Sequence, residues 1–173
     1  QLVPDLYEAW HAGKSSWKKH NYLNKTSIGI EIQNSGHDYI YENFSAKQIY
    51  SLKKLLRNLV KIYKIDKKNI LGHSDIAPNR KKDPGEKFPW KDLSKIKLAK
   101  WHNLNEKKIQ KLRLIKLTYN EENKFLKNLF KIGYNLSRSS KLRSEKKLIF
   151  KAFQRRFRQS LINGKSDHDQ IYR

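Results

Sequence analysis

The chain has 173 residues, with 39 lysine and arginine side chains against 16 aspartate and glutamate side chains, a formal net charge of +23. This length suits one domain, or one ordinary domain with a small second one. No apolar run approaches the roughly 18 residues of a membrane-spanning helix, and the absence of cysteine excludes disulfides, cysteine zinc sites and a cysteine nucleophile.

The first half of the chain mixes strand and helix patterns. Residues 27–33 alternate strictly between isoleucine and other residues, which predicts a strand. Residues 45–48 have the form of a capping box and predict the start of a helix. Its buried stripe is expected to consist of Ile49, Leu52, Leu56, Leu59 and Tyr63. Residues 69–72 predict a short strand ending at His73, followed by a proline-rich loop over 74–90, and this strand–helix–strand order favours an α/β domain.

The second half shows only helix patterns after a linker predicted at residues 94–104. Asn120 is predicted to cap a helix that has two acidic residues in its first turn, and Gly133 is predicted to end it. Another helix is predicted from about Ser144, and a third begins after Asp167.

The positive charge is uneven along the chain. Residues 1–93 hold 17 basic and 10 acidic side chains, a net +7, whereas residues 94–173 hold 22 and 6, a net +16. Such a surplus attracts polyanions such as nucleic acid, anionic lipid or an anionic cell wall. A lysine-, asparagine- and isoleucine-rich coding bias is the alternative explanation.

Four side chains have types and positions that suit hydrolytic chemistry. His73 and Asp83 are joined by a loop that folds back, and imidazole and carboxylate are standard zinc ligands, although both residues also suit an ordinary polar surface. Glu31 lies mid-strand beside Gly29, where it is either a general base next to a metal or a solvated or salt-bridged carboxylate. Lys81 places a positive charge where an oxyanion develops, unless it is one more surface lysine.

Several motifs in the first half occur together in one order and spacing. They are Trp10-His11-Ala12-Gly13-Lys14-Ser15-Ser16-Trp17, Leu23-Asn24, Thr26 through Glu31, His73 through Gly85, and Phe88-Pro89-Trp90. Together they resemble the zinc-dependent N-acetylmuramoyl-L-alanine amidases of the amidase-2 type, which share a fold with peptidoglycan recognition proteins. The resemblance covers residues 1–93 and implies an α/β fold with a mixed central sheet flanked by helices.

The resemblance also implies roles for individual residues. His73 and Asp83 match zinc ligands, Glu31 matches the glutamate that activates water, and Lys81 matches the lysine that stabilises the oxyanion. The remaining candidates are expected near the substrate, and they are His11, Trp10 and Arg80. For Trp10 and Trp17, packing in the fold is favoured over contact with substrate.

The family's first zinc-ligating histidine lies upstream of these motifs, and no histidine precedes His11. We therefore expect the sequence to be a fragment that lacks part of the amidase domain. The 173 residues alone are then expected to have little or no amidase activity.

The second half resembles the three-helix peptidoglycan-binding domain. The matching segments are Asn128 through Tyr134 and Ala152 through Arg158, followed by Gly164 and Asp167, and the third helix is cut off after Arg173. Phe153 and Phe157 are expected in the core, and Arg155 and Arg156 on an exposed face toward an anionic wall.

We therefore predict an amidase domain at residues 1–93, a connecting segment with a helix at 94–119 and an incomplete peptidoglycan-binding-like domain at 120–173. The last is expected to add wall affinity but no chemistry, so that a cut after Leu93 in a complete protein leaves cleavage of soluble muropeptides unchanged.

The predicted activity is hydrolysis of the amide between N-acetylmuramic acid and L-alanine in peptidoglycan or muropeptides, with Zn²⁺ as cofactor. We expect a monomer in the bacterial cell envelope, periplasmic or associated with the outer membrane, with the cytoplasm as the alternative. A non-catalytic peptidoglycan-binding protein on the same fold is the second hypothesis. A nucleic-acid-binding protein is the third, although the chain has no recognised motif for that role beyond its charge.

Overall fold

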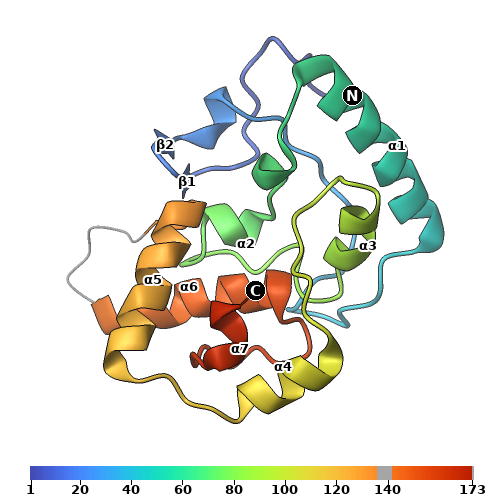
Figure 1. The fold of residues 1–173 in the computed structure, drawn as a ribbon. Coiled ribbons are helices and arrows are strands. Elements are labelled where there is room, and N and C mark those ends of the chain that lie inside the picture. The colour runs from blue at the N-terminus through green and yellow to red at the C-terminus, as the bar shows by residue number, and fades with distance from the viewer. Residues whose placement is uncertain (136–141, 173) are drawn as a thin grey trace.

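The computed structural model describes residues 1–135 and 142–172, and these ranges are rich in helix (Figure 1). The strands β1 (Ser16–Trp17) and β2 (His20–Asn21) form a two-stranded antiparallel sheet. The helices are α1 (Ala46–Tyr63), α2 (His73–Ile76), α3 (Trp90–Lys95), α4 (Glu106–Arg113), α5 (Tyr119–Ile132), α6 (Leu142–Phe157) and α7 (His168–Ile171). Short 3₁₀ turns cover Leu23–Lys25 and Lys67–Asn69. Across the described ranges, no helix combines the length and apolarity needed to cross a membrane.

The expected central sheet is not seen within the described residues. Residues 27–33 are neither helical nor paired in a sheet, and the same holds for residues 70–72. The alternation in 27–33 nevertheless reports burial, because Ile30 and Ile32 pack against a hydrophobic cluster while Glu31 between them is exposed. Side-chain alternation follows from which face is buried, whereas strand pairing also needs a neighbouring backbone.

Helix α1 forms where the local pattern predicts it. The Ser45 hydroxyl accepts a hydrogen bond from the Gln48 amide at 3.2 Å, and the Gln48 side chain accepts one from the Ser45 amide at 2.9 Å. Leu52 and Leu56 are buried, and the helix ends at Lys64 in the left-handed conformation. The capping box therefore accounts for the start and the leucine spacing for the buried face. Tyr63, predicted to belong to the buried stripe, is instead 44% exposed.

Helix α5, the first helix predicted in the second half of the chain, starts earlier than predicted. Thr118, not Asn120, caps α5, because its hydroxyl forms a capping box with Glu121 and leaves Asn120 inside the first turn. Gly133 ends the helix with φ 142°, as predicted. Asp167 precedes α7, but its carboxylate pairs with Arg158 instead of capping the helix.

Two hydrophobic clusters form the core. One joins the N-terminal segment to α5 and α6, and its buried members are Ala12, Trp17, Leu23, Phe125, Leu126, Leu129, Tyr134, Ile149, Phe150, Ala152, Phe153 and Phe157. The other joins α1 to α3 and to the segment after it, with Leu52, Leu56, Phe88, Trp90, Leu93, Leu98 and Ala99 buried. Leu98 and Ala99 thus lie in the core although they belong to the predicted linker. The first cluster combines residues from both predicted domains. The boundary between these two domains stays a prediction.

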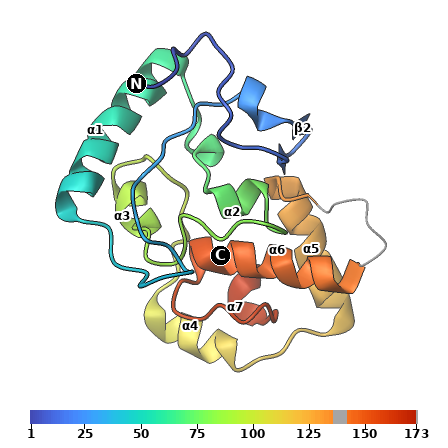
Figure 2. The ribbon, with the colours of Figure 1, turned by 180° about the vertical axis from the view of Figure 1, so that it is seen from behind.

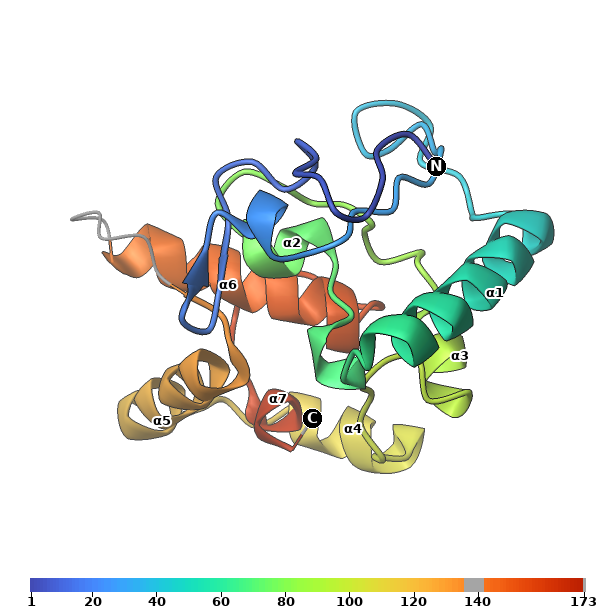
Figure 3. The ribbon, with the colours of Figure 1, turned by 90° about the horizontal axis from the view of Figure 1, so that it is seen from above.

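Helix α6 passes through the middle of the molecule, with α2 on one side and α7 on the other (Figures 1 and 2). Helices α1 and α3 lie together at the end of the molecule away from α5 (Figure 3). Phe153 and Phe157 are in the core, as predicted. Arg156 was expected to be exposed, and this expectation is wrong because only 4% of it is accessible; Arg155 beside it is half-buried.

Candidate active site

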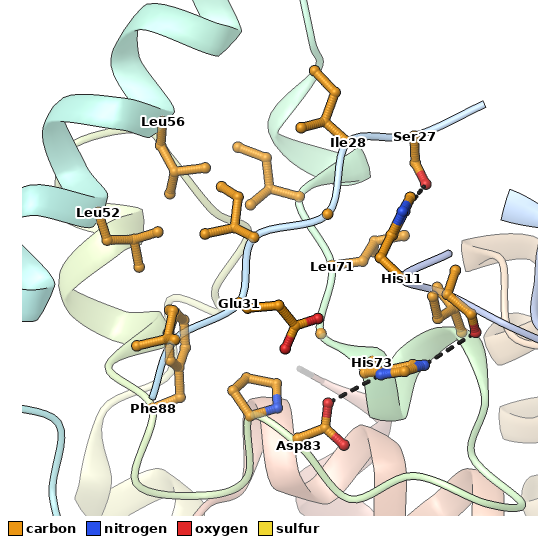
Figure 4. A pocket seen from close by; sticks show the side chains of 18 of the residues that line it. His11, Ser27, Ile28, Glu31, Leu52, Leu56, Leu71, His73, Asp83 and Phe88 are labelled. Carbon is orange, nitrogen blue, oxygen red and sulfur yellow. Dashed lines mark hydrogen bonds and ion pairs between the residues drawn. The ribbon is translucent and has the colours of Figure 1, made fainter. Parts of the chain in front are cut away.

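One pocket collects most of the predicted site residues. Glu31, His73, Lys81 and Asp83 all line it, together with His11 and Trp10. Figure 4 shows the Glu31 carboxylate pointing toward the space beside His73 and Asp83. Side chains from four separate parts of the chain therefore face one cavity.

His73 and Asp83 form the closest pair in this group. The Nδ1 atom of His73 lies 3.1 Å from Oδ2 of Asp83, and the Ser74 amide donates to the Asp83 carbonyl at 2.8 Å. Gly72 allows the loop to fold back this closely, because a Cβ there would lie 2.7 Å from Cδ of Pro84. Burial raises the pKa of the Asp83 carboxyl, but the interactions with His73, a backbone hydrogen bond and the charge of Lys81 together hold that pKa below its usual value.

The other nitrogen of His73 is held by the segment after Trp10. Its Nε2 lies 3.1 Å from the Ala12 carbonyl oxygen and 3.2 Å from a guanidinium nitrogen of Arg80. The side-chain oxygen of Asn24 accepts from the amides of Ala12 and Gly13 at 2.7 and 3.1 Å. The Arg80 guanidinium also donates to the Ala12 carbonyl. The imidazole is therefore oriented through backbone that Asn24 fixes.

His11 fills the space that Gly29 leaves open. A Cβ on Gly29 would lie 2.6 Å from Cβ of His11, so the imidazole rests directly on this residue. The ring nitrogens of His11 lie 2.9 Å from the Ala9 carbonyl and 3.1 Å from the Ser27 hydroxyl. His11 therefore forms one wall of the pocket with both of its nitrogens engaged.

The two tryptophans of the first motif have different environments. Trp17 is 6% exposed and packs edge-on against Tyr134, with ring centroids 5.1 Å apart, as the packing prediction requires. Trp10 is 90% exposed at the pocket, so the same prediction is wrong for it.

Sequence reasoning missed Asp75, which lies two residues after His73 and is 1% exposed. Its carboxylate accepts hydrogen bonds from the Gly72 amide at 2.9 Å, from Arg156 at 2.7 Å and from the Tyr134 hydroxyl at 2.5 Å. No local pattern signals this cluster, because Arg156 follows Asp75 by 81 residues.

A family model, Amidase_2, described as N-acetylmuramoyl-L-alanine amidase, matches residues 1–86. A solved structure of AmiD from E. coli, in complex with anhydro-N-acetylmuramic acid-L-Ala-D-gamma-Glu-L-Lys, is 33% identical with a TM-score of 0.85 and covers 98% of this chain and 68% of that one. The chain belongs to the Amidase_2 family.

Further relatives agree with this membership. The structure of AmpDh3 from Pseudomonas aeruginosa is 32% identical with a TM-score of 0.84 and covers 99% of this chain and 69% of that one. The 1,6-anhydro-N-acetylmuramyl-L-alanine amidase AmpD of Haemophilus influenzae is 42% identical over 91 residues, which are 51% of this chain and 47% of the relative. The chain spans 62% of the length of E. coli AmiD, to which it is 35% identical over 172 residues.

The Amidase_2 match contains Glu31, His73, Lys81 and Asp83. The similarity to AmiD and AmpDh3 also extends through α4 to α7, because both structures cover nearly the whole chain. The fold that supports the pocket is thus common to this chain and these relatives.

Proposed function

We propose that this protein hydrolyses the amide between N-acetylmuramic acid and L-alanine in peptidoglycan or muropeptides. The observation that carries the proposal is the convergence of Glu31, Lys81 and the His73–Asp83 pair on one pocket in an Amidase_2 chain. The muropeptide named in the AmiD complex supports the same class of substrate.

The His73–Asp83 pair fits a zinc ion in its chemistry and spacing. Nδ1 of His73 lies 3.1 Å from Oδ2 of Asp83, and the tautomer that binds a metal through Nδ1 carries its proton on Nε2, toward the Ala12 carbonyl. Two acceptors this close call for a proton or a cation between them, and two ligands sharing a tetrahedral zinc lie about 3.3 Å apart given its bond lengths of ~2.0–2.2 Å. A backbone carbonyl on the other nitrogen is the usual partner of a zinc-bound histidine. Within residues 1–135 and 142–172, no three His, Asp or Glu side chains gather as a metal site.

When bound, zinc polarises the scissile carbonyl and makes water a stronger acid. Glu31 then takes the proton of the attacking water as its oxygen bonds to the carbonyl carbon. As the C–N bond breaks, Glu31 returns that proton to the leaving amine of L-alanine. The Lys81 ammonium stabilises the negative charge that develops on the carbonyl oxygen. His11 and Trp10 border the bound substrate, and Arg80 steadies the backbone that orients His73.

The remaining expectations are part of the same proposal. A mixed central sheet in the amidase domain and a peptidoglycan-binding role for residues 120–173 follow from the family resemblance. The net +16 of residues 94–173 supports attraction to an anionic wall. We place the protein in the bacterial envelope as a monomer, with the cytoplasm as the alternative.

The test is product analysis with a soluble muropeptide and the full-length protein, because the 173 residues alone are expected to have little amidase activity. Mass spectrometry should detect a free peptide with an L-alanine N-terminus, and hydrolysis should stop with a chelator and return with zinc. The Glu31→Gln variant should lose about 10²–10⁴-fold in turnover while it retains zinc. Glu122→Gln, on α5 outside the pocket, is the matched control and should keep full activity. Binding of peptidoglycan and zinc without any free peptide would instead identify a non-catalytic binding protein.

A further inference from the structure

A buried polar cluster connects the predicted zinc ligand to the C-terminal helices. We call it the Asp75 cluster, and it consists of Asp75, Tyr134 and Arg156. Asp75 belongs to α2, which starts at His73, whereas Tyr134 follows α5 and Arg156 lies near the end of α6. All three residues are almost fully buried, with 1%, 0% and 4% of each exposed. Each acceptor oxygen of Asp75 therefore has a partner from the second half of the chain.

Arg156 holds the chain on both sides of His73. One terminal nitrogen donates to Asp75 at 2.7 Å, and the other donates to the Ile70 carbonyl at 2.9 Å. Its guanidinium also stacks 4.1 Å above the ring of Trp90. This planar group thus bridges the backbone before His73 and the helix turn after it, in a way that a single point charge does not reproduce.

Helix α2 depends on such support because it has only four residues. A single helical turn is unstable by itself, since its nucleation costs more than its hydrogen bonds return. The Asp75 carboxylate fixes this turn at its start by accepting from the Gly72 amide at 2.9 Å. Burial beside Asp75 also raises the pKa of Tyr134 well above its usual value, so its hydroxyl stays a donor.

We propose that Tyr134 and Arg156 are positioning residues for the amidase site, because through Asp75 they fix the turn that presents His73 to Asp83. The inference rests on the proposed function, in which this pair binds the metal. It assigns the C-terminal helices a part in the reaction itself, beyond any affinity for the cell wall.

The buried ion pair between Arg158, the first residue after α6, and Asp167 provides a matched control. Both side chains are almost fully buried, but the pair connects the end of α6 to the segment before α7 and does not contact α2. Loss of this pair should cost stability in the same way as loss of the Asp75–Arg156 pair. Only loss of the Asp75–Arg156 pair should alter the geometry of the site.

The experiment compares Asp75→Asn, Tyr134→Phe and Arg156→Met with Asp167→Asn in the full-length protein. Amide hydrogen exchange over residues 72–83 is measured without metal. Zinc affinity is measured by competition with a chromophoric chelator, and kcat and KM are measured with a muropeptide. The three cluster variants should exchange faster over 72–83, bind zinc about 10–100-fold more weakly and lose kcat with little change in KM. Arg156→Lys should recover part of this loss. Asp167→Asn should change zinc affinity less than ~2-fold at a similar loss of thermal stability.

The proposal is overturned if the cluster variants match Asp167→Asn in exchange over 72–83 and in zinc affinity. Tyr134→Phe keeps its ring in the core, so it decides the question by itself if Arg156→Met does not fold. Failure of the proposed function looks different: the full-length protein without substitutions would cleave no muropeptide, while the exchange comparison, which needs neither zinc nor substrate, would still show whether the cluster fixes the turn.

Discussion

The imidazole of His11 rests on Gly29, and the two residues share a space that holds only one side chain. The nearest atoms to an added Cβ at Gly29 are Cβ, Cγ and Cδ2 of His11. Since Cβ and Cγ are close to the backbone, rotation of the ring does not relieve the overlap. Position 29 must therefore be glycine as long as His11 occupies this space.

Gly29→Ala is expected to destabilise the protein by about 1–3 kcal/mol, because it overpacks the wall of the pocket. The measurement is chemical denaturation of the two single variants and of Gly29→Ala/His11→Ala. The double variant should be more stable than the sum of the single effects predicts, since removal of the ring makes room for the methyl group. Additive effects would show that the two residues do not compete for this space.

Lys81→Met should lower kcat about 10²–10³-fold with little change in KM, because the ammonium acts on charge that develops only during the reaction. Lys82→Met is the matched control, since Lys82 is the next residue and is more exposed than Lys81. Nζ of Lys82 lies 3.9 Å from Oδ1 of Asp38. Steady-state kinetics with a soluble muropeptide provides the measurement. Equal losses in both variants would indicate a general effect of charge and not a role for Lys81.

Asn24→Ala should cost about 1–3 kcal/mol of stability, because it removes a buried acceptor for the backbone amides of Ala12 and Gly13. Zinc affinity should fall as well, since the same backbone holds Nε2 of His73. Asn24→Asp keeps an acceptor oxygen and should retain most of both properties. Denaturation and zinc titration of the two variants test this, and an alanine variant with unchanged zinc affinity would contradict the link to His73.

Removal of residues 94–173 is expected to disrupt the amidase half. The sequence alone predicts that soluble muropeptides are still cleaved after such a cut, but Trp17 and Leu23 share their core with α5 and α6, and Asp75 loses both side-chain partners. We now expect residues 1–93 to be sensitive to protease and inactive, whereas the 173-residue chain resists digestion. Limited proteolysis and near-ultraviolet circular dichroism distinguish the outcomes, and a protected short chain would show that its core is sufficient.

Local chemistry in the sequence predicts some parts of this fold well. The capping box at Ser45 and the leucine spacing locate α1, and the loop from His73 to Asp83 brings two ligand types together as expected. The start of α5 was misjudged because Thr118 and Asn120 both suit a helix cap, and only the reach of Glu121 decides between them.

Relationships between distant segments were not predictable in this way. An arginine on a helix next to phenylalanines gives no sign that a buried aspartate 81 residues away will meet it, so Arg156 was expected in solvent. Alternation in residues 27–33 likewise records which side chains face the core and carries no information about a neighbouring strand. The Asn24 contact uses backbone amides, whose positions depend on the finished fold.

The core shared by Trp17, Tyr134 and Phe153 has a consequence for synthesis on the ribosome. Translation proceeds at about 5–20 residues per second, so residues 1–93 emerge several seconds before α6 is complete. During that interval Asp75 has neither Arg156 nor Tyr134 beside it, and the indole of Trp17 has no ring to pack against. The nascent amidase segment should therefore stay unfolded, and open to chaperones, until the C-terminal helices leave the exit tunnel.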